Sequence, residues 1–158
     1  MPWNTIFRYS LHALAFGVIA GAVALMFTRD RLAIVATVYL AMVTEIIGLR
    51  LGLQALRPFR QAWNLAPLKT TLAQWAAGPG ALFYHVAGNL LWFVPLGALL
   101  KKLRPRSRWF HALLAGAALS LFLETCQYLL GTGFPDIDDV LLNAAGALIG
   151  WLIAVVWF

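Results

Sequence analysis

Charged side chains are scarce in this sequence: Asp, Glu, Lys and Arg together make up 11% of its 158 residues, whereas 62% are hydrophobic. A soluble domain of this size carries roughly a quarter charged residues. So few charges cannot cover the surface of a water-soluble globule. The apolar residues also come in long runs rather than in alternation with polar ones, which is the pattern of membrane spans. The sequence therefore predicts an integral membrane protein.

Cysteine is almost absent, and so are the motifs of several common function classes. The single Cys126 excludes both a disulfide framework and a multi-cysteine metal site. The formal net charge is +6, but the basic residues lie in short segments between apolar runs, without a basic helix or an aromatic RNA-binding pattern. There is also no serine-hydrolase elbow, phosphate-binding glycine loop or paired-histidine zinc motif. We therefore expect no nucleic-acid partner, assign no residue as a metal ligand, and identify no cofactor from the sequence.

Five apolar runs are long enough to be spans, since crossing a hydrocarbon core of ~30 Å takes about 20 helical residues. We predict an all-α integral membrane protein: a single domain, 1–158, that forms a bundle of about five transmembrane helices. The predicted spans are residues 6–27, 32–49, 80–100, 109–130 and 140–158. Residues 50–79 mix charges with Pro58, Pro67 and two tryptophans, and they predict an external, amphipathic interfacial loop with a short helix. Pairs of glycines are expected to let helices approach closely at Gly17 and Gly21, Gly48 and Gly52, and Gly146 and Gly150.

The loop charges predict the orientation. Residues 101–108 carry five positive charges and no negative one, so this segment should be cytoplasmic. Five spans then place the N-terminus outside and the C-terminus in the cytoplasm.

With this orientation, the polar residues of the spans gather near the external face. His85 with Asn89, Glu124 with Gln127, and Asp139 with Asn143 each share one helix face. An unpartnered charge in the bilayer core costs about 2.5–3.5 kcal/mol on insertion scales, so these faces should point toward one another. We therefore predict a polar pocket that opens outward, in which Glu124 reaches Asn89 or the block 136–143.

The pocket has candidates for two kinds of role. Glu124 and Asp139 are candidate general bases. The three aspartates at the start of the last span could be helix caps or site residues, and both alternatives stay open. Their carboxylates would suit Mg²⁺ or Ca²⁺ rather than zinc if they converged. The candidate ligand-binding residues are Arg57, Arg60, Asn64, Lys69, His85, Asn89, Gln127, Asp136, Asp138 and Asn143.

Four blocks in these same regions resemble the VanZ-like family. They are Asn64-Leu65-Ala66-Pro67-Leu68, Gly88-Asn89 with Phe93-Val94-Pro95-Leu96-Gly97, Glu124-Thr125-Cys126-Gln127, and Phe134-Pro135-Asp136-Ile137-Asp138-Asp139 followed by Asn143, Gly146 and Gly150. The resemblance is strongest over residues 60–155. It implies a bacterial cytoplasmic-membrane protein with a role in the cell envelope, since the founding member of the family is linked to teicoplanin resistance.

Two classes of function fit these residues, with a third alternative beside them. The first is a binding site for an anionic or lipid-linked envelope molecule, with the basic loop at its phosphate or carboxylate and the acids and amides at its polar head. The second is an intramembrane enzyme, with or without a metal, that acts on such a molecule through Glu124 or Asp139. The third is a structural helper whose partner is another membrane protein.

Overall fold

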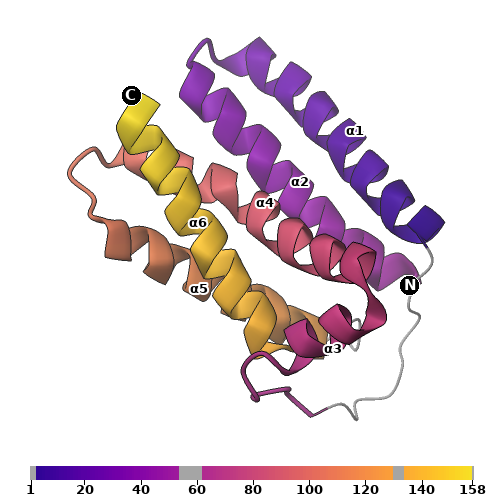
Figure 1. Ribbon diagram of the computed structural model, residues 1–158. Helices are drawn as coiled ribbons and strands as arrows, with labels where there is room; N and C mark the ends of the chain where they lie inside the picture. Colours follow the sequence, from indigo (N-terminus) through magenta and orange to yellow (C-terminus); the bar gives the residue numbers. More distant parts are fainter. Residues whose placement is uncertain (1–2, 54–61, 130–133, 158) are drawn as a thin grey trace. The chain divides into compact units, whose positions relative to one another are not determined.

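The computed structural model describes residues 3–53, 62–129 and 134–157, and it describes the side chains of residues 13–43, 62–129 and 134–157. These residues form six helices, shown in Figure 1: α1 (Trp3–Phe27), α2 (Arg31–Leu53), α3 (Lys69–Ala77), α4 (Pro79–Leu103), α5 (Trp109–Leu129) and α6 (Ile137–Trp157). Within this described part the only strand-like feature is one isolated bridge. The predicted all-α class is confirmed. The chain divides into two compact units, Met1–Arg57 and Pro58–Phe158.

The first unit is a helical hairpin of α1 and α2. Asp30 caps the start of α2, since its carboxylate accepts the Leu32 N–H at 2.9 Å. The two helices approach closely where α1 has glycine. A Cβ added at Gly17 would lie 2.6 Å from Cγ of Met42, and one added at Gly21 would lie 2.8 Å from Cγ2 of Val38. Small residues thus permit this contact, as expected. Gly48 and Gly52 lie outside the residues whose side chains are described.

In the second unit, α6 is the central helix. It packs against both α4 and α5 more extensively than those two pack against each other. Two of its glycines make the approach to α4 possible. A Cβ added at Gly146 would overlap the Leu90 carbonyl oxygen, and one added at Gly150 would overlap that of Val94. The backbones of α4 and α6 are therefore in direct contact, the role expected for this pair of glycines.

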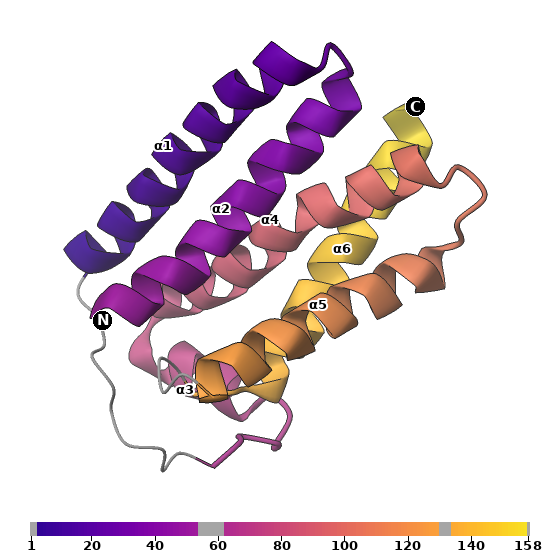
Figure 2. The same cartoon turned by 180° about the vertical axis from the view of Figure 1, so that it is seen from behind.

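Three helices of the described part, α4, α5 and α6, are long and apolar enough to cross a membrane. In α1 and α2 the apolar stretches among the described side chains are shorter, Ala13–Phe27 and Arg31–Val43. The chain is thus an all-α membrane protein, and crossing by α1 and α2 stays a prediction. The short helix α3 lies at the end of the second unit where α4 begins and α5 ends, as Figures 1 and 2 both show.

Candidate functional site: a polar cluster at one end of the second unit

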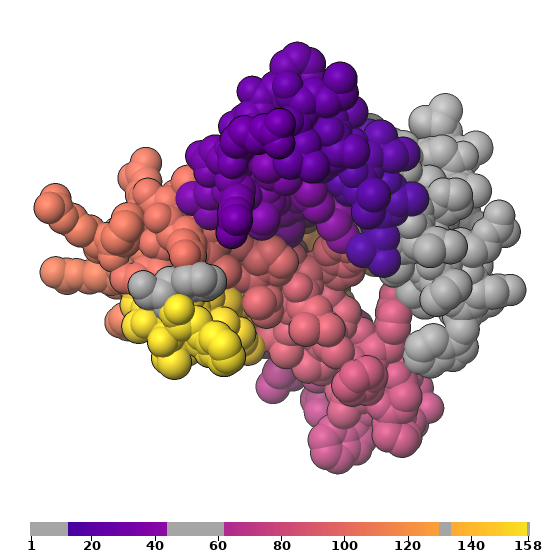
Figure 3. Space-filling model, turned by 90° about the horizontal axis from the view of Figure 1, so that it is seen from above, coloured from indigo at the N-terminus to yellow at the C-terminus, as the bar shows by residue number. Residues whose placement is uncertain are grey.

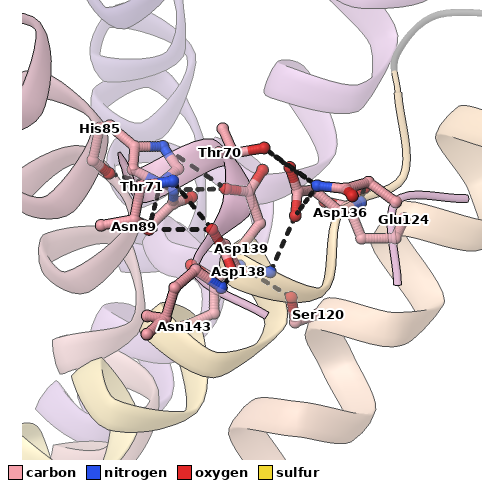
Figure 4. Close-up of polar contacts among 12 residues, drawn as sticks. Thr70, Thr71, His85, Asn89, Ser120, Glu124, Asp136, Asp138, Asp139 and Asn143 are labelled. Atoms are coloured by element: carbon pink, nitrogen blue, oxygen red, sulfur yellow. Dashed lines mark hydrogen bonds and ion pairs between the residues drawn. The ribbon is translucent and has the colours of Figure 1, made fainter. Parts of the chain in front are cut away.

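The segment before α3 joins the segment before α6 through the backbone. The Asn64 N–H donates to the Pro135 carbonyl at 2.9 Å, and the Ile137 N–H donates to the Asn64 carbonyl at 3.0 Å. This pairing brings the polar residues 64–71 against the acidic start of α6, although about 70 residues separate them in the chain. The cluster that results is drawn in Figure 4.

Asp136 precedes α6 and is buried. Its carboxylate accepts the backbone N–H of Asp138, the second residue of α6, at 2.9 Å, which is an N-cap bond. The same carboxylate accepts the side-chain amide of Asn64 at 3.1 Å and the hydroxyl of Thr70. Asp136 therefore caps its own helix and also holds the segment before α3.

Asp138 acts in the same way on another helix. Its carboxylate accepts the backbone N–H of Leu68, and it accepts the backbone N–H and the hydroxyl of Thr71 at 2.9 and 3.0 Å. Leu68 is the residue at the N-cap position of α3, where it has a left-handed φ of 64° and makes no side-chain cap bond. A carboxylate from α6 thus accepts two N–H groups at the start of α3, those of Leu68 and Thr71, although the N-cap residue of that helix has no side chain that could accept them.

Asp139 faces α4 instead. Its Oδ1 accepts the side-chain amide of Asn89 at 2.8 Å and lies 3.7 Å from Nδ1 of His85. The other ring nitrogen of His85, Nε2, lies 3.3 Å from the hydroxyl oxygen of Thr71. Because that hydroxyl donates its one hydrogen to Asp138, it can only accept from His85, so Nε2 carries a proton in this arrangement. Asp139 keeps 28% of its side chain exposed and His85 keeps 11%.

Glu124 and Asn143 form the buried side of the cluster. Glu124 is 3% exposed, and its Oε2 accepts the Asp136 backbone N–H at 3.3 Å. The expected contact between Glu124 and the block 136–143 is therefore confirmed. Asn143 donates to the hydroxyl of Ser120 at 2.8 Å, one turn before Glu124 on α5. Its own Oδ1 is buried and has no hydrogen-bond partner among the described residues.

Not every predicted site residue joins the cluster. Lys69 is exposed at the first position of α3. Gln127 is half-buried, and its side chain makes no hydrogen bond with another residue of the described ranges. Arg57 and Arg60 lie outside the described residues. The others do meet: Asn64, His85, Asn89, Glu124, Asp136, Asp138, Asp139 and Asn143.

Three hydroxyl residues of the cluster were missed in the sequence. Ser120 lies four positions before Glu124 and so shares its helix face, a spacing that could have identified it. Thr70 and Thr71 carry no such signal, because a pair of threonines in a short interfacial segment is common. Their role depends on carboxylates that lie more than 60 residues away in the chain.

The geometry of the cluster favours hydrogen bonding and proton transfer. Among the described residues, no group of three or more His, Cys, Asp or Glu side chains is placed to hold a metal ion. Asp136 and Asp138 are engaged by donors of the chain itself. Asp139, His85 and Asn89 combine an acid, an imidazole and an amide near the surface of the cluster, where a polar head group could reach them.

Comparison with known proteins agrees with the motifs. No curated protein and no solved structure matches the chain. The VanZ/LLP1 family model matches residues 32–158, which is well over half of the sequence and contains the whole polar cluster. The chain therefore belongs to the VanZ/LLP1 family.

Proposed function

We propose that this membrane protein binds the head group of an anionic or lipid-linked cell-envelope molecule at the polar cluster. In this proposal the cluster faces the outside of the bacterial cytoplasmic membrane. The observation that carries the proposal is the orientation of α3, whose two threonines face the cluster and whose Leu72 and Trp75 face away from the protein.

The side chains of α3 are arranged opposite to those of a helix on a soluble protein. Thr70 and Thr71 face inward and bond Asp136 and Asp138. Leu72 and Trp75 point outward with 64% and 70% exposure, and α3 has no buried residue. A helix at a protein–water boundary shows the reverse pattern. An outward face of leucine and tryptophan suits the boundary between head groups and acyl chains. At that depth, the head group of a lipid would lie beside the cluster.

The residues around α3 offer matching groups for such a head. Lys69 is exposed at the start of α3 and is the described cation best placed for a phosphate or carboxylate. Asp139, His85 and Asn89 would hold hydroxyl or amino groups of the head. Arg57 and Arg60, predicted from the sequence, would add to the basic part. A role in teicoplanin resistance would follow if the bound molecule is a precursor of the cell wall.

Lipid binding can be measured on purified protein. We expect a long-chain isoprenoid phosphate added to the protein in detergent to be retained in native mass spectra. Lys69→Gln and Asp139→Asn should each reduce this retention, whereas Arg29→Gln should not, because Arg29 is an exposed cation in the turn between α1 and α2. Equal retention by all four proteins would contradict the proposal. Another membrane protein that co-purifies in place of a lipid would favour the helper role.

A second candidate function has one observation in its favour. His85 lies between the carboxylate of Asp139 and the hydroxyl of Thr71, and with its Nε2 protonated it could act as a general acid, or as a base only at Nδ1, which faces Asp139. An enzyme that acts on the same lipid would use this pair. Such an enzyme would turn over the isoprenoid phosphate, which would be measured with and without Mg²⁺. This turnover should be lost in His85→Gln. Binding of the lipid without turnover would contradict the enzyme and favour the binding function proposed first.

A further inference from the structure

The end of the second unit opposite the polar cluster carries a concentrated positive charge. α4 ends with Lys101 and Lys102 in its last turn, and Arg104, Arg106 and Arg108 follow before α5 begins at Trp109. The three arginines are exposed, and residues 101–108 contain no acid. Because α4 and α5 are both candidate membrane spans, the turn between them lies where the helices leave the bilayer.

The turn formed by residues 101–108 contacts α6 through Trp151. The ammonium group of Lys101 donates to the Pro105 carbonyl at 2.6 Å and lies 5.1 Å from the ring centre of Trp151. The indole N–H of Trp151 donates to the hydroxyl of Ser107 at 2.9 Å. Figure 3 shows the segment between α4 and α5 beside the last part of α6, with long side chains extending away from it. The turn thus has a defined shape before any partner arrives.

Several backbone N–H groups of the turn also have partners within the protein. The N–H of Ser107 donates to the Arg104 carbonyl at 2.8 Å, and the N–H of Arg108 donates to Nδ1 of His111 at 3.0 Å. The guanidinium groups of Arg104, Arg106 and Arg108, in contrast, make no ion pair or hydrogen bond with any residue of the described ranges. Three unpaired guanidinium groups are therefore presented on a fixed turn at the membrane surface.

We propose that Arg104, Arg106 and Arg108 form a docking surface for the anionic head groups of phospholipids in the adjacent leaflet. A guanidinium group binds a phosphate through two parallel hydrogen bonds, and a cluster of basic residues directly beside a span is the pattern of anionic-lipid recognition. Trp109 is 54% exposed next to Arg108, which favours a lipid over a soluble anion because the indole ring needs an apolar neighbour. This inference does not depend on the proposed function of the polar cluster.

The test compares two pairs of arginines in purified protein, in detergent, where orientation in a membrane has no influence. We expect phosphatidylglycerol to bind the unaltered protein more tightly than phosphatidylcholine. Arg104→Gln/Arg106→Gln should weaken phosphatidylglycerol binding about tenfold or more, and Arg108→Gln should weaken it further. The control Arg29→Gln/Arg31→Gln removes the same charge where α1 connects to α2, from the turn and from the first residue of α2, and should leave the affinity unchanged.

Three results would overturn the proposal. The first is unchanged affinity in Arg104→Gln/Arg106→Gln, and the second is an equal loss in the control pair. The third is competition by millimolar inorganic phosphate, which would identify a site for a soluble anion rather than a lipid surface. If the arginine variants do not fold, the salt dependence of binding by the unaltered protein still tests the proposal. Its binding of phosphatidylglycerol must weaken as salt is raised, and affinity that is independent of salt contradicts an electrostatic surface.

Discussion

Asp138 lies in α6, yet its carboxylate accepts two backbone N–H groups and a hydroxyl from the start of α3. Both carboxylate oxygens act as acceptors in these bonds. An asparagine at this position has only one acceptor oxygen and would turn its NH₂ group toward one of the donors. The charge of Asp138 is therefore matched to its donors, whether or not it also serves a ligand.

We predict that Asp138→Asn destabilises the protein by about 1–3 kcal/mol, because one partly buried donor at the start of α3 loses its partner. The loss would be measured as a lower unfolding temperature in detergent. Gln127→Ala is the control, since Gln127 has no hydrogen bond within the described part of the chain, and it should change stability by less than about 0.5 kcal/mol. An Asp138→Asn protein as stable as the unaltered one would show that the cap bonds are not needed.

Glu124 and Asp139 can be separated by amide substitutions. Glu124 is buried and accepts the Asp136 N–H, a bond that the carbonyl oxygen of glutamine can also accept. Asp139 is the more exposed acid beside His85, and its role in a ligand site would need its charge. We expect Glu124→Gln to keep lipid retention and Asp139→Asn to lose most of it, with both proteins folded by circular dichroism. Loss in Glu124→Gln instead would support Glu124 as the general base.

The sequence identified the ionisable members of the cluster because a charge in an apolar run needs a partner. It could not separate their roles. The three aspartates at residues 136–139 look alike in the sequence, whereas in the structure one caps its own helix, one caps α3 and one faces His85. This division depends on the contact between residues 64–71 and the start of α6, which no local pattern encodes.

At the scale of the elements, the contact between α4 and α6 depends on glycine. We predict that Gly150→Ala destabilises the protein by about 1–3 kcal/mol, because the added Cβ would overlap the Val94 carbonyl oxygen and separate the helices. Gly88 on α4 provides the matched control, since a Cβ there would meet nothing within 4 Å. Gly88→Ala should be neutral or stabilising by up to about 1 kcal/mol, because alanine is the better helix former.

Thermal unfolding of the two glycine variants in detergent would measure this difference. A Gly150→Ala protein at least as stable as Gly88→Ala would contradict the close backbone contact.

Hydropathy and glycine spacing were sufficient to predict this class of helix packing. They could not predict the orientation of α3. A nine-residue helix is only marginally stable alone, and α3 is fixed by bonds to Asp136 and Asp138 rather than by an apolar face.

At the scale of the whole molecule, the two ends of the second unit differ in charge. One end has the carboxylates of Asp136, Asp138 and Asp139, and the other has the basic residues of the turn 101–108. Basic loops are retained in the cytoplasm during insertion, so this difference predicts which end faces outside. The proposed site can meet an external envelope molecule only if the acidic end is the external one.

Single cysteines would test this orientation in a Cys126→Ala background. Ala66 and Leu103 suit the purpose, because both are exposed, uncharged and at opposite ends of the second unit. We expect a membrane-impermeant thiol reagent, added to intact cells, to label Ala66→Cys. Leu103→Cys should react only after the membrane is permeabilised. Labelling of Leu103→Cys in intact cells, with protection of Ala66→Cys, would place the polar cluster in the cytoplasm. The arginine turn would then face outside, so the cluster could no longer bind an external head group, whereas lipid binding by purified protein at the arginine turn would be unaffected.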